Sequence, residues 1–570
     1  MSRSLMQSLK DTAAGLSRRD LFKSGSLLAL PALLLGKQAA APAAAAEAAV
    51  PLAPLAPGGL EIGPNLYKSI GVRSFINGTG TLTVNSGSLE LPEVQAAQEW
   101  ASKHMVQLDE LMEAVGTRLA ALTGAEFGIV TSGCAAAMTH AAAACLTGGN
   151  PDKHVHLPSM EGMDKSEIII PKAARNNYDA ALRATGAKII EVRTAEELEA
   201  AINPKTAMIY IRSEVPNGPP TNVDTYRIAK AHNIPVLIDA APEVLTLPNV
   251  HLQAGATMVC YSGGKQLRGP QCTGLLLGRK DLVRAAWVGS APHHGFSRSM
   301  KVGKEEIMGL LAAVEVWSKT DQKVRWQRLI DKCEVIAKKM TSIQGVTTRI
   351  NESAPTQLSN RNVTIAVSWD PNARGITGQE VARILDTTEP RIMVSGGGGG
   401  GGGRRGGGAG AAAGPAGAAG AAPAAPTPGI SVSAFNLGPN EEKIVAERVH
   451  AILSAKHTLA PTPPPAPPAA TITGEWDVEI QYRAGKGTHL LTVNQTGAQI
   501  QGTHKGDFLS RPLNGTVSGA SVRLTSNVGE NVIGNSINYT FVGTVAGDRM
   551  SGTLTMGEYL DATWSARKRA

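Results

Sequence analysis

The sequence contains few aromatic and few charged residues, and what it lacks narrows the possible functions. Aromatic residues make up 4% and charged residues 18% of the 570 positions, while 42% are hydrophobic, which is enough for ordinary cores. The formal net charge of +8 is not gathered on a basic helix interleaved with aromatic residues. Because such a patch marks nucleic-acid-binding proteins, we interpret the charge as solvated surface and expect no nucleic-acid partner.

Cysteine is also scarce, and its placement argues against disulfides and metal sites. The five cysteines are an odd number at spacings that match no metal pattern, and Cys260 and Cys272 lie too far apart for a CxxC pair. The adjacent His293 and His294 would diverge on a helix or a strand, and no third ligand is evident. We therefore expect no metal, no disulfide framework, and cysteines that are mostly small buried residues.

The apolar run near the N-terminus, residues 27–35, is too short to span a bilayer as a stable anchor. It follows the pair Arg18 and Arg19 and precedes an alanine-rich stretch. A charged region, a short apolar region and small residues predict a signal peptide over residues 1–46. The paired arginines resemble the twin-arginine export signal. We expect export of the folded protein, with a periplasmic or secreted location.

Glycine and proline, in contrast, are abundant, with 63 and 34 residues, and their clusters divide the chain. A disordered linker is predicted over residues 47–61, and a semi-rigid proline-rich linker over residues 457–470. Residues 396–428 are rich in glycine and alanine without a fixed period. We interpret this insertion as a flexible loop and not as a phosphate-binding turn.

Apolar strands that alternate with helical patterns predict an α/β fold with a mostly parallel sheet for a large domain, residues 62–318. Its expected strands lie at residues 125–131, 207–211, 235–238, 258–261 and 274–277. A smaller α/β domain is expected over residues 319–456. Its expected elements are helices at 326–340 and 441–453 and strands near 364–367 and 392–394.

The last part of the chain, residues 471–570, changes character and predicts a small antiparallel β-barrel. Short alternating strands are expected at residues such as 476–480, 490–493 and 536–542. Turns such as Asn514-Gly515 and Gly547-Asp548 are expected to separate the strands.

A possible phosphate-binding turn follows the first expected strand. Ser132, Gly133 and Cys134 join that strand to an alanine-rich helix. A glycine lets the backbone approach an anion, and the N-terminus of the helix offers free N–H groups. Many strand-to-helix turns contain Ser-Gly, so the turn taken alone favours a structural role.

Two further polar residues follow later strands. Asp239 ends the strand at 235–238, on the side where α/β sheets bind ligands, and a carboxylate there can keep a pyridine nitrogen protonated. Lys265 lies in a glycine-rich loop after Ser262, whose hydroxyl is suited to a phosphate. Taken alone, the aspartate is compatible with a helix cap and the lysine with a solvated loop. The order of phosphate turn, aspartate and lysine favours a cofactor site.

With these residues in place, the chain resembles the selenocysteine-synthase-like family of pyridoxal 5'-phosphate (PLP) enzymes, which includes L-seryl-tRNA(Sec) selenium transferases and D-glucosaminate-6-phosphate ammonia-lyase-like proteins. The resemblance runs from about residue 71 to 453 and includes INGTGT at residues 76–81. SGGKQLRGPQ at residues 262–271 and MKVGKEE at residues 300–306 are most similar to the ammonia-lyase-like branch.

The resemblance implies a type I PLP-dependent transferase fold with PLP as cofactor. It also implies that Lys265 carries PLP as a Schiff base, that Asp239 faces the pyridine nitrogen, and that a homodimer or larger homo-oligomer shares its active sites. The tRNA-binding region of the selenium transferases has no counterpart here, where a signal peptide and linker stand instead. The C-terminal module resembles, more weakly, the lipocalin-like barrels appended to exported bacterial hydrolases.

Four other residues are candidates for ligand contacts. Arg298 and Lys301 are placed to face an anionic ligand group, or they belong to ordinary basic surface. Arg391 is suited to a substrate carboxylate, which a guanidinium can bind with two hydrogen bonds. Tyr178 is compatible both with contact to the cofactor and with packing of a helix.

We expect a PLP-dependent lyase that catalyses α,β-elimination or deamination of an amino acid or amino-sugar acid. One alternative is a PLP-dependent transferase, either selenium-transferase-like or an aminotransferase. A second alternative is a binding protein that keeps the fold without the chemistry, although the presence of both Lys265 and Asp239 argues against it. The substrate is expected to be a small amino-acid-like molecule.

Overall fold

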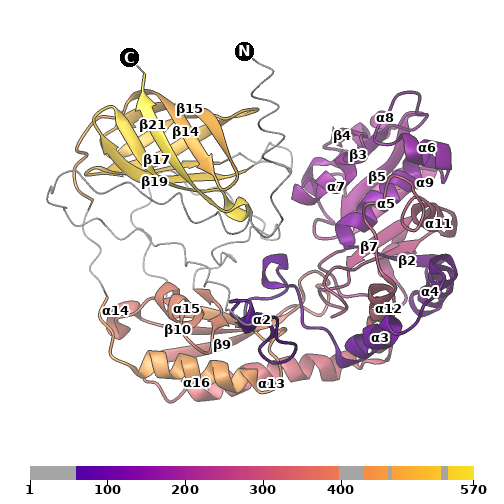
Figure 1. Cartoon of the computed structure of the whole chain (residues 1–570), viewed down its shortest axis with the longest axis horizontal. Helices are drawn as coiled ribbons and strands as arrows, with labels where there is room; N and C mark the ends of the chain where they lie inside the picture. Colours follow the sequence, from indigo (N-terminus) through magenta and orange to yellow (C-terminus); the bar gives the residue numbers. More distant parts are fainter. Residues whose placement is uncertain (1–58, 397–428, 460–464, 528–536, 570) are drawn as a thin grey trace, which may run out of the picture. The chain divides into compact units, whose positions relative to one another are not determined.

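A seven-stranded sheet forms the centre of the first α/β domain in the computed structural model, which describes residues 59–396, 429–459, 465–527 and 537–569 (Figure 1). The strand order is β2-β8-β7-β6-β5-β3-β4. The strands are β2 (Phe127–Thr131), β3 (Glu167–Pro171), β4 (Lys188–Val192), β5 (Thr206–Arg212), β6 (Val236–Asp239), β7 (Met258–Ser262) and β8 (Gly274–Gly278). Neighbours from β4 to β7 are parallel and β8 is antiparallel to both of its neighbours, so the predicted mostly parallel sheet is confirmed.

The strands of this sheet are almost continuous apolar runs because both of their faces are covered. Every residue of β2 and of β8 is buried, as are four of the five residues of β3. Alanine dominates α5, whose small side chains allow close packing against the sheet. The helices of this domain are α3 (Pro92–Ser102), α4 (Leu108–Thr123), α5 (Cys134–Thr147), α6 (Pro151–His156), α7 (Ala180–Arg183), α8 (Ala195–Ala201), α9 (Asn222–Ala231), α10 (Val250–Ala254), α11 (Lys280–Val288) and α12 (Lys304–Lys319).

The smaller α/β domain contains a four-stranded antiparallel sheet with the order β12-β13-β10-β9. Helices α13 and α16 pack side by side, as Figure 1 shows. The elements are α13 (Gln322–Met340), β9 (Val346–Glu352), β10 (Val363–Trp369), α14 (Pro371–Arg374), α15 (Gly378–Thr387), β11 (Ile392–Met393), β12 (Ser395–Gly396), β13 (Gly429–Ser433) and α16 (Glu441–Ser454). The two helices and the strands expected here from the sequence are confirmed.

The start of the predicted large domain contributes to the smaller domain, which the sequence did not predict. Strand β1 (Ile76–Asn77) pairs in parallel with β11, and Ile76 is buried in the second core together with Ile392. The chain divides into two units at this point, Met1–Arg73 and Ser74–Ala570. The described part of the first unit contains one helical turn, α2 (Leu66–Ser69).

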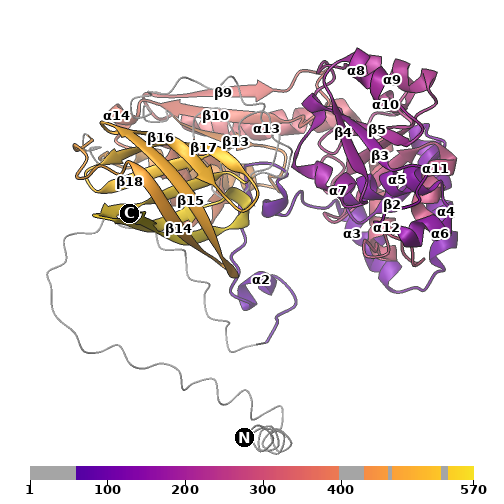
Figure 2. The ribbon, with the colours of Figure 1, turned by 90° about the horizontal axis from the view of Figure 1, so that it is seen from above.

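The C-terminal module is a closed barrel of eight antiparallel strands (Figure 2), in which β21 pairs back onto β14 (Figure 1). The strands are β14 (Gly474–Tyr482), β15 (Gly485–Thr496), β16 (Gln499–Lys505), β17 (Ser510–Ser518), β18 (Ser521–Ser526), β19 (Tyr539–Ala546), β20 (Arg549–Thr555) and β21 (Asp561–Lys568). The predicted barrel is therefore confirmed, and alternate side chains such as Trp476, Val478 and Ile480 fill its core.

One predicted turn in the barrel is wrong. Asn514 and Gly515 lie in the middle of β17, whereas Gly547, with φ 60°, forms the predicted turn between β19 and β20. A Cβ at Gly515 would lie 2.2 Å from the carbonyl oxygen of Arg523 on the neighbouring strand. The glycine therefore permits close approach of two strands, a role that the Asn-Gly pattern does not distinguish from a hairpin turn.

Several predictions concern residues that the structure does not describe. The predicted signal peptide, the linker as far as residue 58 and residues 397–428 of the insertion lie outside the described ranges. Within those ranges, no helix is both long and apolar enough to cross a membrane. All five cysteines are free, and Cys145, Cys260 and Cys333 are buried, as expected for small core residues.

Candidate active site

The turn between β2 and α5 is built for close contact with an anion. Gly133 occupies the N-cap with φ 100° and ψ 157°, a conformation that favours glycine. Because Gly133 has no side chain to cap the helix, the N–H groups of the first turn of α5 are free to bind a ligand. The hydroxyl of Ser132 donates a hydrogen bond to the Met300 carbonyl oxygen at 3.0 Å. This bond brings the segment that carries Arg298 and Lys301 to the phosphate turn.

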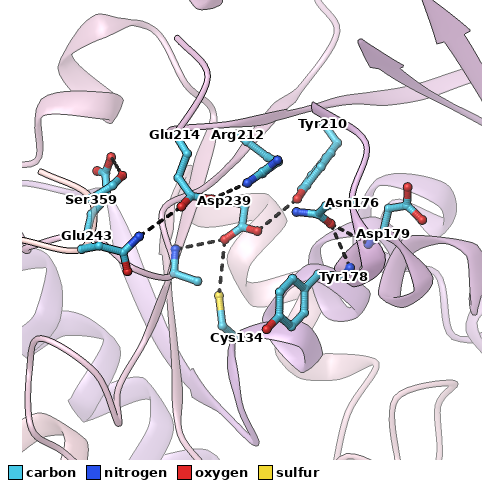
Figure 3. A network of polar contacts seen from close by, with 12 residues as sticks. Cys134, Asn176, Tyr178, Asp179, Tyr210, Arg212, Glu214, Asp239, Glu243 and Ser359 are labelled. Atoms are coloured by element: carbon cyan, nitrogen blue, oxygen red, sulfur yellow. Dashed lines mark hydrogen bonds and ion pairs between the residues drawn. The ribbon is translucent and has the colours of Figure 1, made fainter. Parts of the chain in front are cut away.

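Asp239 ends β6 at the same edge of the sheet, and its exposed fraction is only 7%. Its carboxylate accepts hydrogen bonds from the Tyr210 hydroxyl and from the Ala241 backbone N–H, each at 3.0 Å (Figure 3). Burial raises the pKa of Asp239, while the Ala241 N–H, the nearby Lys265 and the Tyr210 hydroxyl oppose that rise. A cationic group placed against this carboxylate would lower its pKa and stabilise the charged form.

Two thiols lie beside Asp239, which the spacing of the cysteines did not reveal. The sulfur of Cys134 is 3.9 Å from Oδ1 of Asp239, and one ligand atom each from Cys134, Asp239 and Cys260 lie within 4.8 Å of one another (Figure 3). A hydrogen bond with Cys134 and burial raise the pKa of the Cys260 thiol. Because metals bind the thiolate form, this shift opposes a metal site, and the expected absence of a metal stays a prediction.

Lys265 lies in the loop between β7 and β8, close enough to Asp239 to influence its pKa. The loop is tight, because a Cβ at Gly264 would lie 2.4 Å from the Cα of Gln271. No described residue forms a hydrogen bond or ion pair with the Lys265 ammonium or a hydrogen bond with the Ser262 hydroxyl. Both groups are therefore available to a ligand that contacts Asp239.

A loop of the smaller domain holds the chain that follows Asp239. Ser359 donates to the buried carboxylate of Glu243 at 3.0 Å, and Asn360 donates to Glu214 at 3.3 Å (Figure 3). Backbone bonds join the same loop to Pro242 and Val244. The two domains thus fix the strand end that carries Asp239.

Three arginines, Arg268, Arg325 and Arg361, gather beside the Lys265 loop, and sequence reasoning missed all of them. Burial, together with repulsion from Arg268 and Arg361, lowers the pKa of Arg325 to about 10. The Gln266 side chain accepts from Arg325 at 3.4 Å and donates to the Arg361 carbonyl oxygen at 2.9 Å. No carboxylate of a described residue forms an ion pair with any of the three, and the buried Nε of Arg361 has no hydrogen-bond partner in the described chain.

Two of the guanidinium groups stack on aromatic rings instead of pairing with acids, while Arg268 donates a hydrogen bond to the Leu89 carbonyl oxygen at 2.8 Å. Arg325 lies over the rings of Trp317 and Phe435 at 4.9 and 5.4 Å, and Arg361 lies over the ring of Trp326 at 4.6 Å. These contacts hold the positive charges without neutralising them. The members of the cluster are far apart in the sequence, so no spacing pattern signals it.

The remaining candidates have mixed placements. Tyr178 is 43% exposed and, with Ser132 and Met300, lines a cavity of about 370 Å³ beside the phosphate turn. Arg391 forms an ion pair of 2.8 Å with Asp386 of its own domain, and its guanidinium also lies over the Phe75 ring. The structure therefore brings Tyr178 to the phosphate turn, and substrate binding by Arg391 stays a prediction.

The comparisons with known proteins agree with this geometry. A family model described as aminotransferase class-V matches residues 93–400. D-glucosaminate-6-phosphate ammonia lyase of Salmonella typhimurium (strain 14028s / SGSC 2262) is 31% identical over 330 residues, which are 56% of this chain and 86% of the lyase. The 5'-C-glycyluridine monooxygenase-decarboxylase of Streptomyces sp is 29% identical over 341 residues, 57% of this chain and 83% of that enzyme.

A solved structure gives the same result for the fold. A D-glucosaminate-6-phosphate ammonia-lyase matches with a TM-score of 0.57 at 26% identity, over 69% of this chain and 98% of that one. The resemblance to the ammonia-lyase-like branch that the sequence predicted is confirmed. The family match ends before the barrel begins.

Proposed function

The chain belongs to the aminotransferase class-V family and is a PLP-dependent enzyme, and from this premise we propose that it is a lyase acting by α,β-elimination or deamination on an amino acid or amino-sugar acid. The observation that carries the proposal is the unpaired Lys265 amine beside the buried carboxylate of Asp239. The 31% identity to an ammonia lyase supports the reaction class.

The described residues fit the cofactor group by group. Asp239 would hold a proton on the pyridine nitrogen, since its buried carboxylate favours a cationic partner. The free N–H groups at the start of α5 and the Ser262 hydroxyl would bind the phosphate. Lys265 would carry the cofactor through its amine. When bound, PLP supplies an aldehyde for amines and an electron-withdrawing ring.

The same residues account for the first step of an elimination, the removal of the proton from the substrate Cα. Lys265, once its amine is free, is the base that takes the proton from the substrate Cα. Burial of Asp239 and the Tyr210 hydroxyl bond keep the carboxylate fixed while charge develops on the substrate. The close packing of Gly264 against Gln271 fixes the backbone of the loop that carries Lys265.

The arginine cluster of Arg268, Arg325 and Arg361 supports an anionic substrate. Guanidinium groups bind carboxylate and phosphate oxygens through paired hydrogen bonds. These three form no ion pair with a described carboxylate, although Glu93 lies near enough to act on the charge of Arg268, and they adjoin the Lys265 loop. An amino-sugar acid or an amino acid with a second acidic group would supply the missing negative charge.

Turnover measurements test the proposal. The purified, PLP-loaded protein is incubated with a panel of α-amino acids that carry a β-hydroxy or β-amino group, including D-glucosaminate-6-phosphate. Release of ammonia together with a keto acid is the expected result. Amino-group transfer to an added keto acid without net ammonia release would replace the lyase with an aminotransferase, and a protein that takes up no PLP would favour the binding-protein alternative.

We also propose that the enzyme is exported in its folded state, on the strength of Arg18-Arg19 and the short apolar run that follows. Replacing both arginines with lysine should retain the protein in the cytoplasm. Unchanged recovery outside the cytoplasm would reject the twin-arginine route.

We further propose a homodimer or larger homo-oligomer, as the family resemblance implies. The open cavity beside Ser132 and Tyr178 is the place where a second copy would complete the site. Light scattering of the full-length protein tests the proposal, and a monomer at all concentrations would contradict it.

A further inference from the structure

The barrel interior contains a row of hydrogen-bonded polar side chains, which the packing of an apolar core does not require. His489 and His504 are joined at 2.8 Å, and His504 is joined to the Ser526 hydroxyl at 2.8 Å. The exposed fractions of the two histidines are 4% and 0%. Burial lowers the pKa of both side chains, that of His504 to about 3, so both are neutral near pH 7.

A cavity of about 570 Å³ lies at the end of this row of polar side chains. Its walls include Tyr482, His489, Arg511, Tyr539 and Met556. The volume lies within the range of small-molecule binding sites, and the mainly apolar wall with a few polar groups has the composition typical of them.

Arg511 supplies the fixed positive charge of the cavity. Its exposed fraction is 8%, and its buried Nε has no hydrogen-bond partner among the described residues. The guanidinium lies 5.2 Å from the centre of the Tyr539 ring. Asp507 also lines the cavity but is exposed and forms no ion pair with Arg511. A buried guanidinium without an acidic partner is costly to the folded protein.

The mouth of the cavity exposes apolar side chains. Phe508 is 95% exposed, Tyr559 57% and Leu509 38%, and all three line the cavity. Large apolar side chains that are exposed together in one patch often mark a binding site. The site therefore offers an apolar entrance, which also carries the exposed Arg483, an aromatic wall, and the buried, unpaired Arg511 inside.

We propose that this end of the barrel binds a small organic acid with an apolar body, its acid group on Arg511 and its body against Tyr539 and Met556. A fatty acid and an aryl-substituted acid share this chemistry. The site is separate from the lyase site proposed above and does not depend on it.

Calorimetric titration of the full-length protein tests the proposal with matched pairs of ligands. The pairs are octanoate against octan-1-ol and 4-phenylbutyrate against 4-phenylbutan-1-ol, which differ only in the acid group. At least one acid should bind about tenfold more tightly than its alcohol. Hydrogen bonds between a charged acid group and the buried Arg511 guanidinium should raise the affinity by about this factor. Preference for octanoate would identify a fatty-acid site, and preference for 4-phenylbutyrate an aryl-acid site.

Substitutions locate the site. R511M should abolish the preference for the acid over the alcohol without lowering the melting temperature, because it removes an unpaired buried charge. R523M is the matched control, since Arg523 is an exposed arginine on the outer face of β18. Equal binding of acid and alcohol, no binding of either acid, or equal loss in R511M and R523M would each overturn the proposal. If R511M does not fold, the comparison of acid with alcohol on the unaltered protein still decides the matter.

Discussion

Two charged side chains are buried in two regions of this protein, and their surroundings differ. Asp239, at the edge of the α/β sheet, accepts hydrogen bonds from the Tyr210 hydroxyl and the Ala241 N–H. Arg511, inside the barrel, leaves its Nε without a partner in the described chain. Both charges are costly to bury, but only the first is compensated by the protein itself.

The difference shows how each region is prepared for its ligand. Around Asp239 the protein fixes the charge first, and a cofactor then meets a carboxylate whose orientation is already set. Around Arg511 the compensation is left to the ligand. The first arrangement suits a group that is always present, and the second suits a molecule that comes and goes.

The largest expected effect comes from Lys265 of the first region. In K265A, turnover should fall by at least about 10³-fold, because in the proposed mechanism the same amine attaches the cofactor and moves the proton. Borohydride reduction followed by peptide mass analysis should find no covalent PLP. K319A, which changes an exposed lysine, serves as control and should keep both properties. A single PLP-modified lysine elsewhere in K265A would show that the assignment is wrong.

The next effect tests whether the charge of Asp239 matters separately from attachment. D239N should keep covalent PLP but lose about 10²-fold or more in turnover, because a neutral amide cannot keep the ring nitrogen protonated. Loss of a buried counter-charge can lower the pKa of that nitrogen by several units. The measurements are borohydride trapping and steady-state kinetics. Normal turnover in D239N would mean that this carboxylate does not contact the ring.

A smaller effect concerns the neutral histidine of the barrel. The pKa of His504 is lowered from 6.5 to about 3 by burial, so the unfolded chain binds more protons than the folded barrel between these values. The contribution of neutral His504 to the free energy of unfolding is therefore fully present above pH 6.5. It falls as the pH drops below 6.5, by at most about 1.4 kcal/mol per pH unit. The protection factors of the β16 amides, in which exchange is corrected for its intrinsic pH dependence, should fall between pH 7 and 5.

The matched variants for that prediction are H504Q and H294Q. H504Q keeps hydrogen-bonding capacity without a titrating ring, so its exchange, after correction for the intrinsic pH dependence, should change less between pH 7 and 5. H294Q, which changes an exposed histidine outside the barrel, should behave like the unaltered protein. Identical pH dependence in all three proteins would show that His504 does not control the stability of the barrel.

The sequence predicted the strand ends of the first region well, for a physical reason. A strand buried on both faces, such as β6, is a short apolar run, so the polar residue that ends it is easy to find. Asp239 was proposed as a site residue in this way, whereas Lys265 was proposed from its place in the glycine-rich loop that follows β7. The cluster of Arg268, Arg325 and Arg361 was missed because the tertiary fold alone brings these residues together.

The barrel was predicted as an architecture but not as a site. The signal for Arg511 was present in the alternation of β17, because Arg511 shares its side of the strand with the buried Leu513 and Val517. The Asn-Gly pair was instead interpreted as a turn, which broke the strand and hid that alternation. The error arose because Gly515 serves close strand approach and not chain reversal.

The smallest expected effect tests whether the two regions work independently. Deleting the residues after His457 removes the barrel and its proline-rich linker and leaves the α/β cores intact. PLP affinity and turnover should stay within about twofold of the full-length values, because separate cores fold as separate domains. The acid-binding heat assigned to Arg511 should vanish in the same protein, since its cavity is lined by barrel residues alone. Loss of PLP on truncation would show that the barrel supports the catalytic site, and persistence of acid binding would place the acid site in the α/β region.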